Sequence, residues 1–281
     1  AFRLLPSESF PSRKRVQNYC FFLTYQSFFQ KKCVPLQKIS FYNHFYPRER
    51  HKTMKKVLGL GNALTDMLLQ VSEDDLRELG FPKGSMNLIS MEQAEQIQMR
   101  FASVRKHMVA GGSASNAINT IAALGGKAAF IGKIGNDEVG DFYREDMIKN
   151  NVKPILLTSN KEMSGCSIVL ITPDGERTFA TYLGAASEMQ ADDIQKEAFI
   201  GYDIFHIEGY LVQNHALIEK AIRLAKESGC MVSLDLASYN VVNENHLFLK
   251  ELIRQYVDIV FANEDESFAY THLNPEESVA K

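Results

Sequence analysis

The sequence lacks any stretch that approaches the ~18 consecutive apolar residues a membrane-spanning helix needs. We therefore expect no membrane partner. Cysteine is also scarce, and its four residues have neither the spacing of a metal site nor that of a disulfide framework: Cys20, Cys33, Cys166 and Cys230. Scattered thiols of this kind are typical of a reducing compartment, so we expect a cytoplasmic protein.

Two common nucleotide-binding motifs are missing as well. No Gly-Lys-Ser/Thr follows a glycine-rich turn, which excludes a P-loop. No G-x-G-x-x-G follows the first strand-like segment, which argues against a dinucleotide-binding oxidoreductase. Any nucleotide or sugar site must therefore be built in another way.

Charge is unevenly distributed along the 281 residues. The chain has 31 Lys and Arg against 34 Asp and Glu, a net charge of −3. Residues 1–53 hold ten of the basic residues and only two of the acidic ones, so the remainder is acidic, with a net charge of −11. An acidic body argues against nucleic-acid binding, and we expect no such partner.

Residues 1–53 show neither helical nor strand periodicity over a useful length, although they are rich in aromatic residues. They also lack the apolar core and cleavage site of a secretory signal. We interpret them as an extension outside the folded domain, either disordered or upstream of a true start at Met54. An organelle transit peptide is the alternative. Residues 54–281 then form the domain.

The stretch from Ala110 to Gly140 organises the rest of that domain. Gly111 and Gly112 precede a helical pattern, and the helix is followed by a strand and a second helix. A helix that starts behind two glycines lets a polar ligand approach the backbone and the positive end of the helix dipole. Asn116 in the first turn adds a donor and an acceptor. A simple turn explains the glycine pair equally well.

Polar residues also follow two other predicted strands. Asn62 and Asp66 come after the strand KVLGLG, in a predicted loop at the end where open α/β sheets bind ligands. A turn in which both side chains bond their own backbone is the alternative. Asn263 and Glu266 follow a strand near residue 260. They form a capping box, and they can also hold Mg²⁺ through water.

The order of the predicted elements indicates the fold class. Strands and helices alternate between residues 203 and 262, which is typical of a parallel sheet with helices on both faces. Before that, two strands near 166–172 and 177–183 flank the turn Pro-Asp-Gly-Glu and form a hairpin. We expect the hairpin to make a small separate sheet that covers a site.

These segments, in this order, resemble the PfkB (ribokinase-like) family of small-molecule kinases, and most of all its adenosine kinase branch. The resemblance covers about residues 54–281. It rests on GNALTD at 61–66, AGGSASN at 110–116 with GKIGNDEVG at 132–140, RTFATYLGAA at 177–186 and NEDE at 263–266. It implies an α/β fold with a mostly parallel central sheet flanked by helices. It also implies a small β lid, with strands near 84–90 and 165–184.

The resemblance implies a substrate site. Asp66 matches the carboxylate that accepts hydrogen bonds from two sugar hydroxyls, and Asn62 matches the contact beside it. Gly111, Gly112 and Asn116 match the clamp that holds the sugar by backbone amides and a side-chain amide.

The resemblance also implies a lid and a phosphate site. Arg177 and its hairpin match the lid that closes over the substrate. Asn263 and Glu266 match the N-x-x-E motif that orders Mg²⁺ and the phosphates of ATP. A nucleobase would need an apolar wall, for which four residues are candidates by position: Met86, Leu88, Phe179 and Tyr182. His206 and His215 have no nucleophile or metal set nearby, so we interpret both as structural.

The function that follows from the resemblance is an ATP- and Mg²⁺-dependent kinase acting on the primary hydroxyl of a nucleoside, adenosine first. A ribose or fructose kinase of the same family is one alternative, and a non-catalytic ligand-binding module is another. The partner is then a small nucleoside or sugar. The chain is expected to be a monomer or a homodimer joined through the lid.

Two departures from the family pattern matter. The second residue after Asn116 is normally small, and here it is Ile118. The catalytic Asp of the family lies in a Gly-Ala-Gly-Asp motif beyond Lys281, so no residue of this chain takes that role. We expect this chain to be a fragment that cannot turn over by itself.

Overall fold

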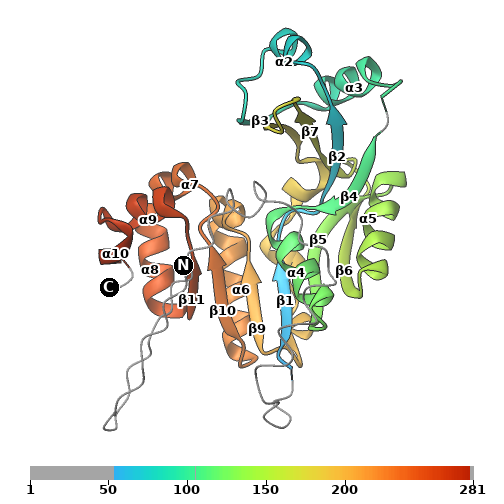
Figure 1. Cartoon of the computed structure of the whole chain (residues 1–281). Helices are drawn as coiled ribbons and strands as arrows, with labels where there is room; N and C mark the ends of the chain where they lie inside the picture. The colour runs from blue at the N-terminus through green and yellow to red at the C-terminus, as the bar shows by residue number, and fades with distance from the viewer. Residues whose placement is uncertain (1–53, 105, 279–281) are drawn as a thin grey trace, which may run out of the picture.

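The computed structural model describes residues 54–104 and 106–278. The predicted extension, residues 1–53, lies outside the described residues, and so do Cys20 and Cys33. Among the described residues, no helix is both long and apolar enough to cross a lipid bilayer. The described part of the chain has two sheets, with the larger one below the smaller one in Figure 1.

The larger sheet has six strands in the order β11-β10-β9-β1-β5-β6, and every pair is parallel. Helices flank it on both faces, so the predicted α/β class and mostly parallel sheet are confirmed. One edge strand, β6, was not predicted. The strands are β1 (Lys56–Leu60), β5 (Lys127–Gly135), β6 (Val152–Ser159), β9 (Ile204–Ile207), β10 (Met231–Asp235) and β11 (Ile259–Phe261).

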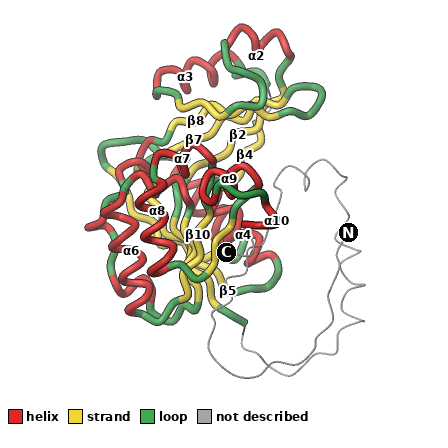
Figure 2. The backbone as a smooth tube through the Cα atoms, turned by 90° about the vertical axis from the view of Figure 1, so that its left-hand side faces the viewer, coloured by secondary structure: helices red, strands yellow, loops and turns green. Residues whose placement is uncertain are grey.

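Helices cover the two faces of this sheet, as the rotated view in Figure 2 shows for α6 and α8 on one side and α4 on the other. One face carries α4 (Ser113–Ala123) and α5 (Glu138–Lys149). The other carries α6 (His215–Glu227) and α8 (His246–Tyr256), together with the 3-10 turns η2 (Gly184–Glu188), η3 (Ala191–Asp193), η4 (Lys196–Phe199) and η5 (Gly209–Gln213). The remaining helices follow β10 and β11: α7 (Tyr239–Glu244), α9 (Glu264–Thr271) and α10 (Pro275–Ser278).

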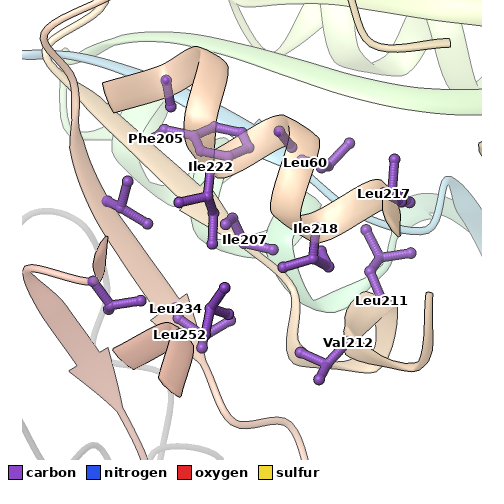
Figure 3. Close-up of a cluster of buried hydrophobic side chains, with 14 of the residues drawn as sticks. Leu60, Phe205, Ile207, Leu211, Val212, Leu217, Ile218, Ile222, Leu234 and Leu252 are labelled. Carbon is purple, nitrogen blue, oxygen red and sulfur yellow. The ribbon is translucent and has the colours of Figure 1, made fainter. Parts of the chain in front are cut away.

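Helix α6 shows how the sequence pattern sets this packing. Its apolar residues recur every three to four positions and are buried, while Asn214 caps its start by accepting a hydrogen bond from the Leu217 amide. Side chains of α6 meet those of β9 and β10 in the core drawn in Figure 3, among them Ile218, Phe205 and Leu234. This burial supplies most of the stability of such a helix.

Both histidines singled out in the sequence pack against aromatic rings. His206 is buried on β9, where its ring hydrogen-bonds Ser233 at 3.0 Å and lies edge-on to Phe261. His215 stacks on Phe248 with ring centroids 3.8 Å apart. Neither ring lies in a group of residues that could hold a metal within the described chain.

The second sheet is larger than the sequence analysis predicted. It has five strands in the order β3-β8-β7-β2-β4, and β2 and β4 were not predicted. The predicted hairpin is present as β7 and β8, which pair antiparallel. The strands are β2 (Leu64–Gln70), β3 (Met86–Leu88), β4 (His107–Gly111), β7 (Gly165–Ile171) and β8 (Arg177–Tyr182).

The prediction that Asp66 lies in a loop is wrong, because Asp66 is the third residue of β2. The segment LTDMLLQ alternates between buried and half-exposed positions, as expected for a strand with one covered face. Its covered face packs on α2 (Glu73–Leu79) and α3 (Met91–Arg100), which lie on the outer side of the second sheet in Figure 1. Asp66 is on the opposite face, toward the larger sheet.

Helix α3 has a well-defined start and end. Ser90 and Gln93 form a capping box before its first turn. The helix stops at Arg100, so Phe101 is its C-cap and Val104 lies beyond it. Both apolar side chains nevertheless pack into the same core as Ile97.

The unusual Ile118 is accommodated by a glycine in β1. Ile118 is completely buried on α4, in the core between that helix and the larger sheet. A Cβ atom at Gly59 would lie only 2.5 Å from Cγ1 of Ile118, far inside van der Waals contact. The bulk that departs from the family pattern therefore fits because the strand beneath has no side chain at this position.

We predict that Gly59→Ala lowers the free energy of unfolding by about 1–3 kcal/mol, because the new methyl group overpacks this core. Ile118→Ala alone should cost about 2–5 kcal/mol through the cavity it leaves. The double variant should be more stable than the sum of the two losses implies, because the methyl group added at position 59 would then occupy part of that cavity. Urea unfolding of all four proteins measures the coupling, and strict additivity would contradict this packing.

Candidate functional site

The site lies where the chain passes between the two sheets. Strand β1 ends at Leu60, and three residues later the chain enters β2 of the second sheet. Strand β4 returns to the larger sheet and leads through Gly112 directly into α4. The carboxyl end of β1, the Asp66 side of β2 and the start of α4 therefore meet at one junction.

Asp66 and Gly111 are packed together at this junction. A Cβ atom at Gly111 would lie 2.2 Å from Cγ of Asp66 and 2.3–2.4 Å from its two oxygens. The carboxylate thus occupies the space that a side chain at position 111 would need. A side chain at position 111 would displace the carboxylate from this place, so the first glycine of the pair has a structural reason independent of any ligand.

Gly112 is held close to Asn62 in the same way. Its φ of +94° lies in the region that favours glycine, and a Cβ atom there would lie 2.4 Å from the backbone oxygen of Asn62. Gly112 is the N-cap of α4 and provides no side chain to bond the helix amides. The two passages between the sheets therefore touch through backbone atoms.

A buried glutamate, Glu208, links the two chain segments that connect the sheets. The sequence analysis missed this residue. Glu208 follows β9 and is 1% exposed. Its carboxylate accepts hydrogen bonds from the Asn62 side-chain amide at 2.7 Å and from the Ala114 backbone amide at 3.3 Å. The side-chain amide group expected to contact substrate thus donates to Glu208, which makes Asn62 part of the scaffold in this structure.

Burial determines the acidity of the two carboxyl groups. Burial raises the pKa of Asp66 to about 6, and the positive charge of Arg177 opposes part of that increase. Burial raises the pKa of Glu208 to about 7, against the hydrogen bonds from Ala114 and Asn62. Arg177 is exposed at the start of β8 and acts on Asp66 through its charge.

The remaining clamp residue, Asn116, is in α4 as predicted. Its backbone amide donates to the Gly112 oxygen at 2.9 Å, as the first turn of the helix requires. Its side chain is half-buried. The structure thus brings five of the six residues predicted to bind substrate to the junction, and Arg177 approaches it from β8: Asn62, Asp66, Gly111, Gly112 and Asn116.

The strand pairing identifies which side chains share a face with Asp66. Asp66 pairs with Ser167, which pairs with Thr181, which in turn pairs with Leu88. Two residues away along each strand, Leu68 pairs with Val169, which pairs with Phe179, which in turn pairs with Met86. Three of the four candidates for a nucleobase wall are therefore on the Asp66 face: Met86, Leu88 and Phe179.

The fourth candidate, Tyr182, is not on this face, so its prediction as part of the wall is corrected. It follows Thr181 and so faces the other way, where it packs into the core of α2 and α3 and donates a hydrogen bond to Glu162.

Asn263 and Glu266 form the predicted capping box at the start of α9. The Asn263 side chain accepts from the Glu266 amide at 2.9 Å, and the Glu266 carboxylate accepts from both the backbone and the side-chain amide of Asn263. Burial raises the pKa of Glu266 to about 7, helped by the negative charges of Asp235 and Asp265. Both oxygens of this carboxylate are therefore engaged within the cap.

Asp235 connects this cap with the junction. It ends β10 and lies between the two groups, with its Oδ2 3.4 Å from Ser113 Oγ at the start of α4. Its charge raises the pKa of both Glu208 and Glu266. Sequence reasoning missed both Asp235 and Glu208, although each carries the signal used for Asn263 and Glu266: a carboxylate at the carboxyl end of a predicted strand.

Comparison with known proteins identifies the family of the chain. Residues 85–281 match the family described as pfkB family carbohydrate kinase. The chain belongs to that family. Its match covers well over half of the chain and includes most of the residues described above.

Individual relatives agree with the family. The chain is 26% identical over 227 residues to guanosine-inosine kinase from Escherichia coli K12, covering 76% of this chain and 52% of the relative. Among solved structures, adenosine kinase from Sinorhizobium meliloti is 30% identical with a TM-score of 0.70, covering 81% of this chain and 70% of that protein. A probable sugar kinase from Rhizobium etli is 29% identical with a TM-score of 0.71 and the same coverage.

The chain spans about half the length of the curated relative with which it shares that 26% identity. The match therefore identifies the family and the fold. The activity and the substrate of this chain are proposals that rest on the geometry of the junction.

We predict that Gly112→Ala destabilises the fold much more than Gly125→Ala, although both glycines have a positive φ, +94° and +88°. Gly125→Ala should cost about 1–3 kcal/mol from backbone strain alone, since only the end of Met54 lies within 4 Å. Gly112→Ala adds a clash with a backbone oxygen and should cost at least about 2 kcal/mol more. Equal losses in urea unfolding would show that the two passages do not touch.

We also predict that Glu208 makes stability depend on pH. Its folded pKa of about 7 is above its ordinary value of 4.5, so its stabilising contribution is complete below pH 4.5 and is lost as pH rises through 7. Between pH 5 and 8 the wild type should lose up to about 3 kcal/mol relative to Glu208→Gln. The control is Glu219→Gln, at an exposed position of α6. A difference in unfolding free energy between the wild type and Glu208→Gln that stays constant with pH would contradict the raised pKa of Glu208.

Proposed function

We propose that this chain forms the substrate-binding part of an ATP-dependent kinase that phosphorylates the primary hydroxyl of a nucleoside. The observation that carries the proposal is the Asp66 carboxylate, which is seated on Gly111 at the start of α4 and faces the larger sheet. Membership of the pfkB family supports a kinase, and the adenosine and guanosine-inosine kinases among its relatives support a nucleoside.

Asp66 suits the recognition of two neighbouring hydroxyl groups. Its pKa of about 6 leaves it mostly ionised at pH 7, so both oxygens can accept hydrogen bonds from a ribose. Burial makes those bonds stronger than they would be in water, and it fixes the carboxylate before the ligand arrives. Because Gly111 has no side chain, the carboxylate itself lies against the backbone near the positive end of α4.

The face of the second sheet around Asp66 supports a nucleobase as the other part of the ligand. Met86 and Leu88 are 49% and 64% exposed, and Phe179 is half-buried beside them. Large apolar side chains on one face of a sheet, next to a buried carboxylate, suit a ligand with a flat apolar part and a polyol part. Movement of this sheet over the substrate as a lid is part of the proposal, because exclusion of water favours phosphoryl transfer.

Asn263 and Glu266, with Asp235 beside them, fit the edge of a Mg²⁺ and phosphate site. Their donors are carboxylate and amide oxygens. Burial, helped by the charges of Asp235 and Asp265, raises the pKa of Glu266, and a nearby cation would favour its ionised form. The described residues contain no group of three or more His, Cys, Asp or Glu that could hold a metal by itself. These side chains would therefore hold Mg²⁺ through water and the ATP phosphates, where it would neutralise the transferring charge.

A sugar kinase is the second candidate. The family is described as carbohydrate kinases, and the Rhizobium etli structure of 29% identity is a probable sugar kinase. Asp66 and Gly111 suit a free sugar as well as a nucleoside, since both present neighbouring hydroxyls. The apolar face at Met86, Leu88 and Phe179 favours the nucleoside, because a free sugar has no flat apolar part to cover it.

We predict that adenosine, inosine or guanosine binds the chain saturably in calorimetric titrations. Asp66→Asn should weaken that binding at least tenfold, because an amide can accept at only one of the two positions. The control is Asp74→Asn on the exposed side of α2, which should bind like the wild type. Binding of ribose or fructose alone would support the sugar kinase. No binding by a folded chain, or equal binding by both variants, would contradict a substrate site at Asp66.

A further inference from the structure

A cavity lies on the larger sheet, away from the junction. It has a volume of about 880 Å³ and is lined by apolar side chains of β5, β6 and the segment from η3 to Tyr202, among them Ile131, Ile155, Leu157 and Ile194. Lys56 and Lys127, at its rim, are the first residues of β1 and β5. This amino-end cavity is thus separated from Asp66, which lies beyond the carboxyl end of β1.

The fold leaves this space because α6 and α8 do not extend over the β6 edge of the larger sheet on this face. Helices α6 and α8 pack with β9 and β10 in the core of Figure 3, whereas 3-10 turns cover the same face at β5 and β6. Edge strand β6 therefore keeps Ile155 and Leu157 only half-buried. Cavities of 300–1,000 Å³ with mainly apolar walls are the usual size and character of small-molecule sites.

Three lysines at the rim give the cavity a positive end. Lys56 pairs with Lys127, and Lys153 pairs with Ala129, two residues after Lys127, so the three side chains are on one face of three neighbouring strands. The Lys56 ammonium group reaches the Gly201 wall of the cavity, 4.0 Å from where a Cβ atom would be. Like charges on neighbouring strands repel, so an anion bound among them would be stabilised.

The acidic groups near the cavity leave most of this charge available. Asp193 accepts from Lys133 at 3.1 Å and from the Gln190 amide, and Asp203 faces Lys55 and Lys56. Glu197 also lines the cavity. Within residues 54–104 and 106–278, the ammonium groups of Lys127 and Lys153 make no hydrogen bond or ion pair.

We propose that the amino-end cavity binds a small organic anion with an apolar body. The anionic group contacts Lys127 and Lys153 at the rim, and the body packs on Ile155, Leu157 and Tyr202. The chemistry suits both an aryl phosphate and a medium-chain carboxylate, because each combines one charged end with an apolar part of this size. The site is independent of the proposed kinase function, since it shares no residue with the junction.

The test uses the fluorescent probe 1-anilinonaphthalene-8-sulfonate, an aromatic anion, with the full chain. We expect saturable binding of one probe molecule that is weakened at least tenfold in Lys127→Gln/Lys153→Gln. The matched control, Lys149→Gln/Lys161→Gln, removes two exposed lysines elsewhere and should bind like the wild type. Leu157→Gln should weaken the probe through the apolar wall, and Asp66→Asn should have no effect.

Competition with the bound probe then identifies the chemical class of the natural ligand. Displacement of the probe by 1-naphthyl phosphate supports an aryl phosphate, and displacement by decanoate supports a carboxylate. The proposal fails if the two lysine pairs have equal effects, if several probe molecules bind without saturation, or if neither competitor displaces the probe. Circular dichroism of each variant verifies that the fold is intact, so a loss of binding is not mistaken for unfolding.

Discussion

The close packing of the Asp66 carboxylate against Gly111 is the constraint on which the rest of the junction depends. It leaves no room for a side chain at position 111, and it places the half-buried carboxylate of β2 beside the start of α4. Gly112 and Asn62 then bring the two passages between the sheets into backbone contact. Glu208 joins them by accepting from Asn62 and from the first turn of α4. The packing of the junction thus depends on the two glycines that the sequence analysis predicts to hold the substrate.

Carboxylates concentrated along one edge of the sheet are costly to bury. The raised pKa values of Asp66, Glu208 and Glu266 show that each is held in a place that disfavours its charged form. Groups with perturbed pKa values occur at functional sites more often than elsewhere, because sites that bind polyols or cations hold charged groups away from bulk water. Here the destabilisation is offset by the large apolar core beneath, where α6 packs on β9 and β10.

Local patterns in the sequence were enough to predict the elements with strong periodicity and clear caps. Helix α6 follows from its apolar spacing and Asn214, and the α9 capping box follows from Asn263 and Glu266. Strand β2 was missed because it begins only three residues after β1, so Asp66 looked like part of a loop. Glu208 carries the same strand-end signal as Glu266, but its contact with Asn62, 146 residues away, is one that no local pattern reports. The resemblance to the PfkB family supplied the roles that spacing alone left open.

The most direct test of the account is a crystal structure of the chain with adenosine bound. The account predicts ribose density against the Asp66 carboxylate and the backbone of Gly111 and Gly112. It also predicts the adenine beside Phe179 and Leu88 on the same face of the second sheet. Adenosine bound elsewhere, with the Asp66 carboxylate contacting only protein atoms, would contradict the assignment of this junction as the substrate site.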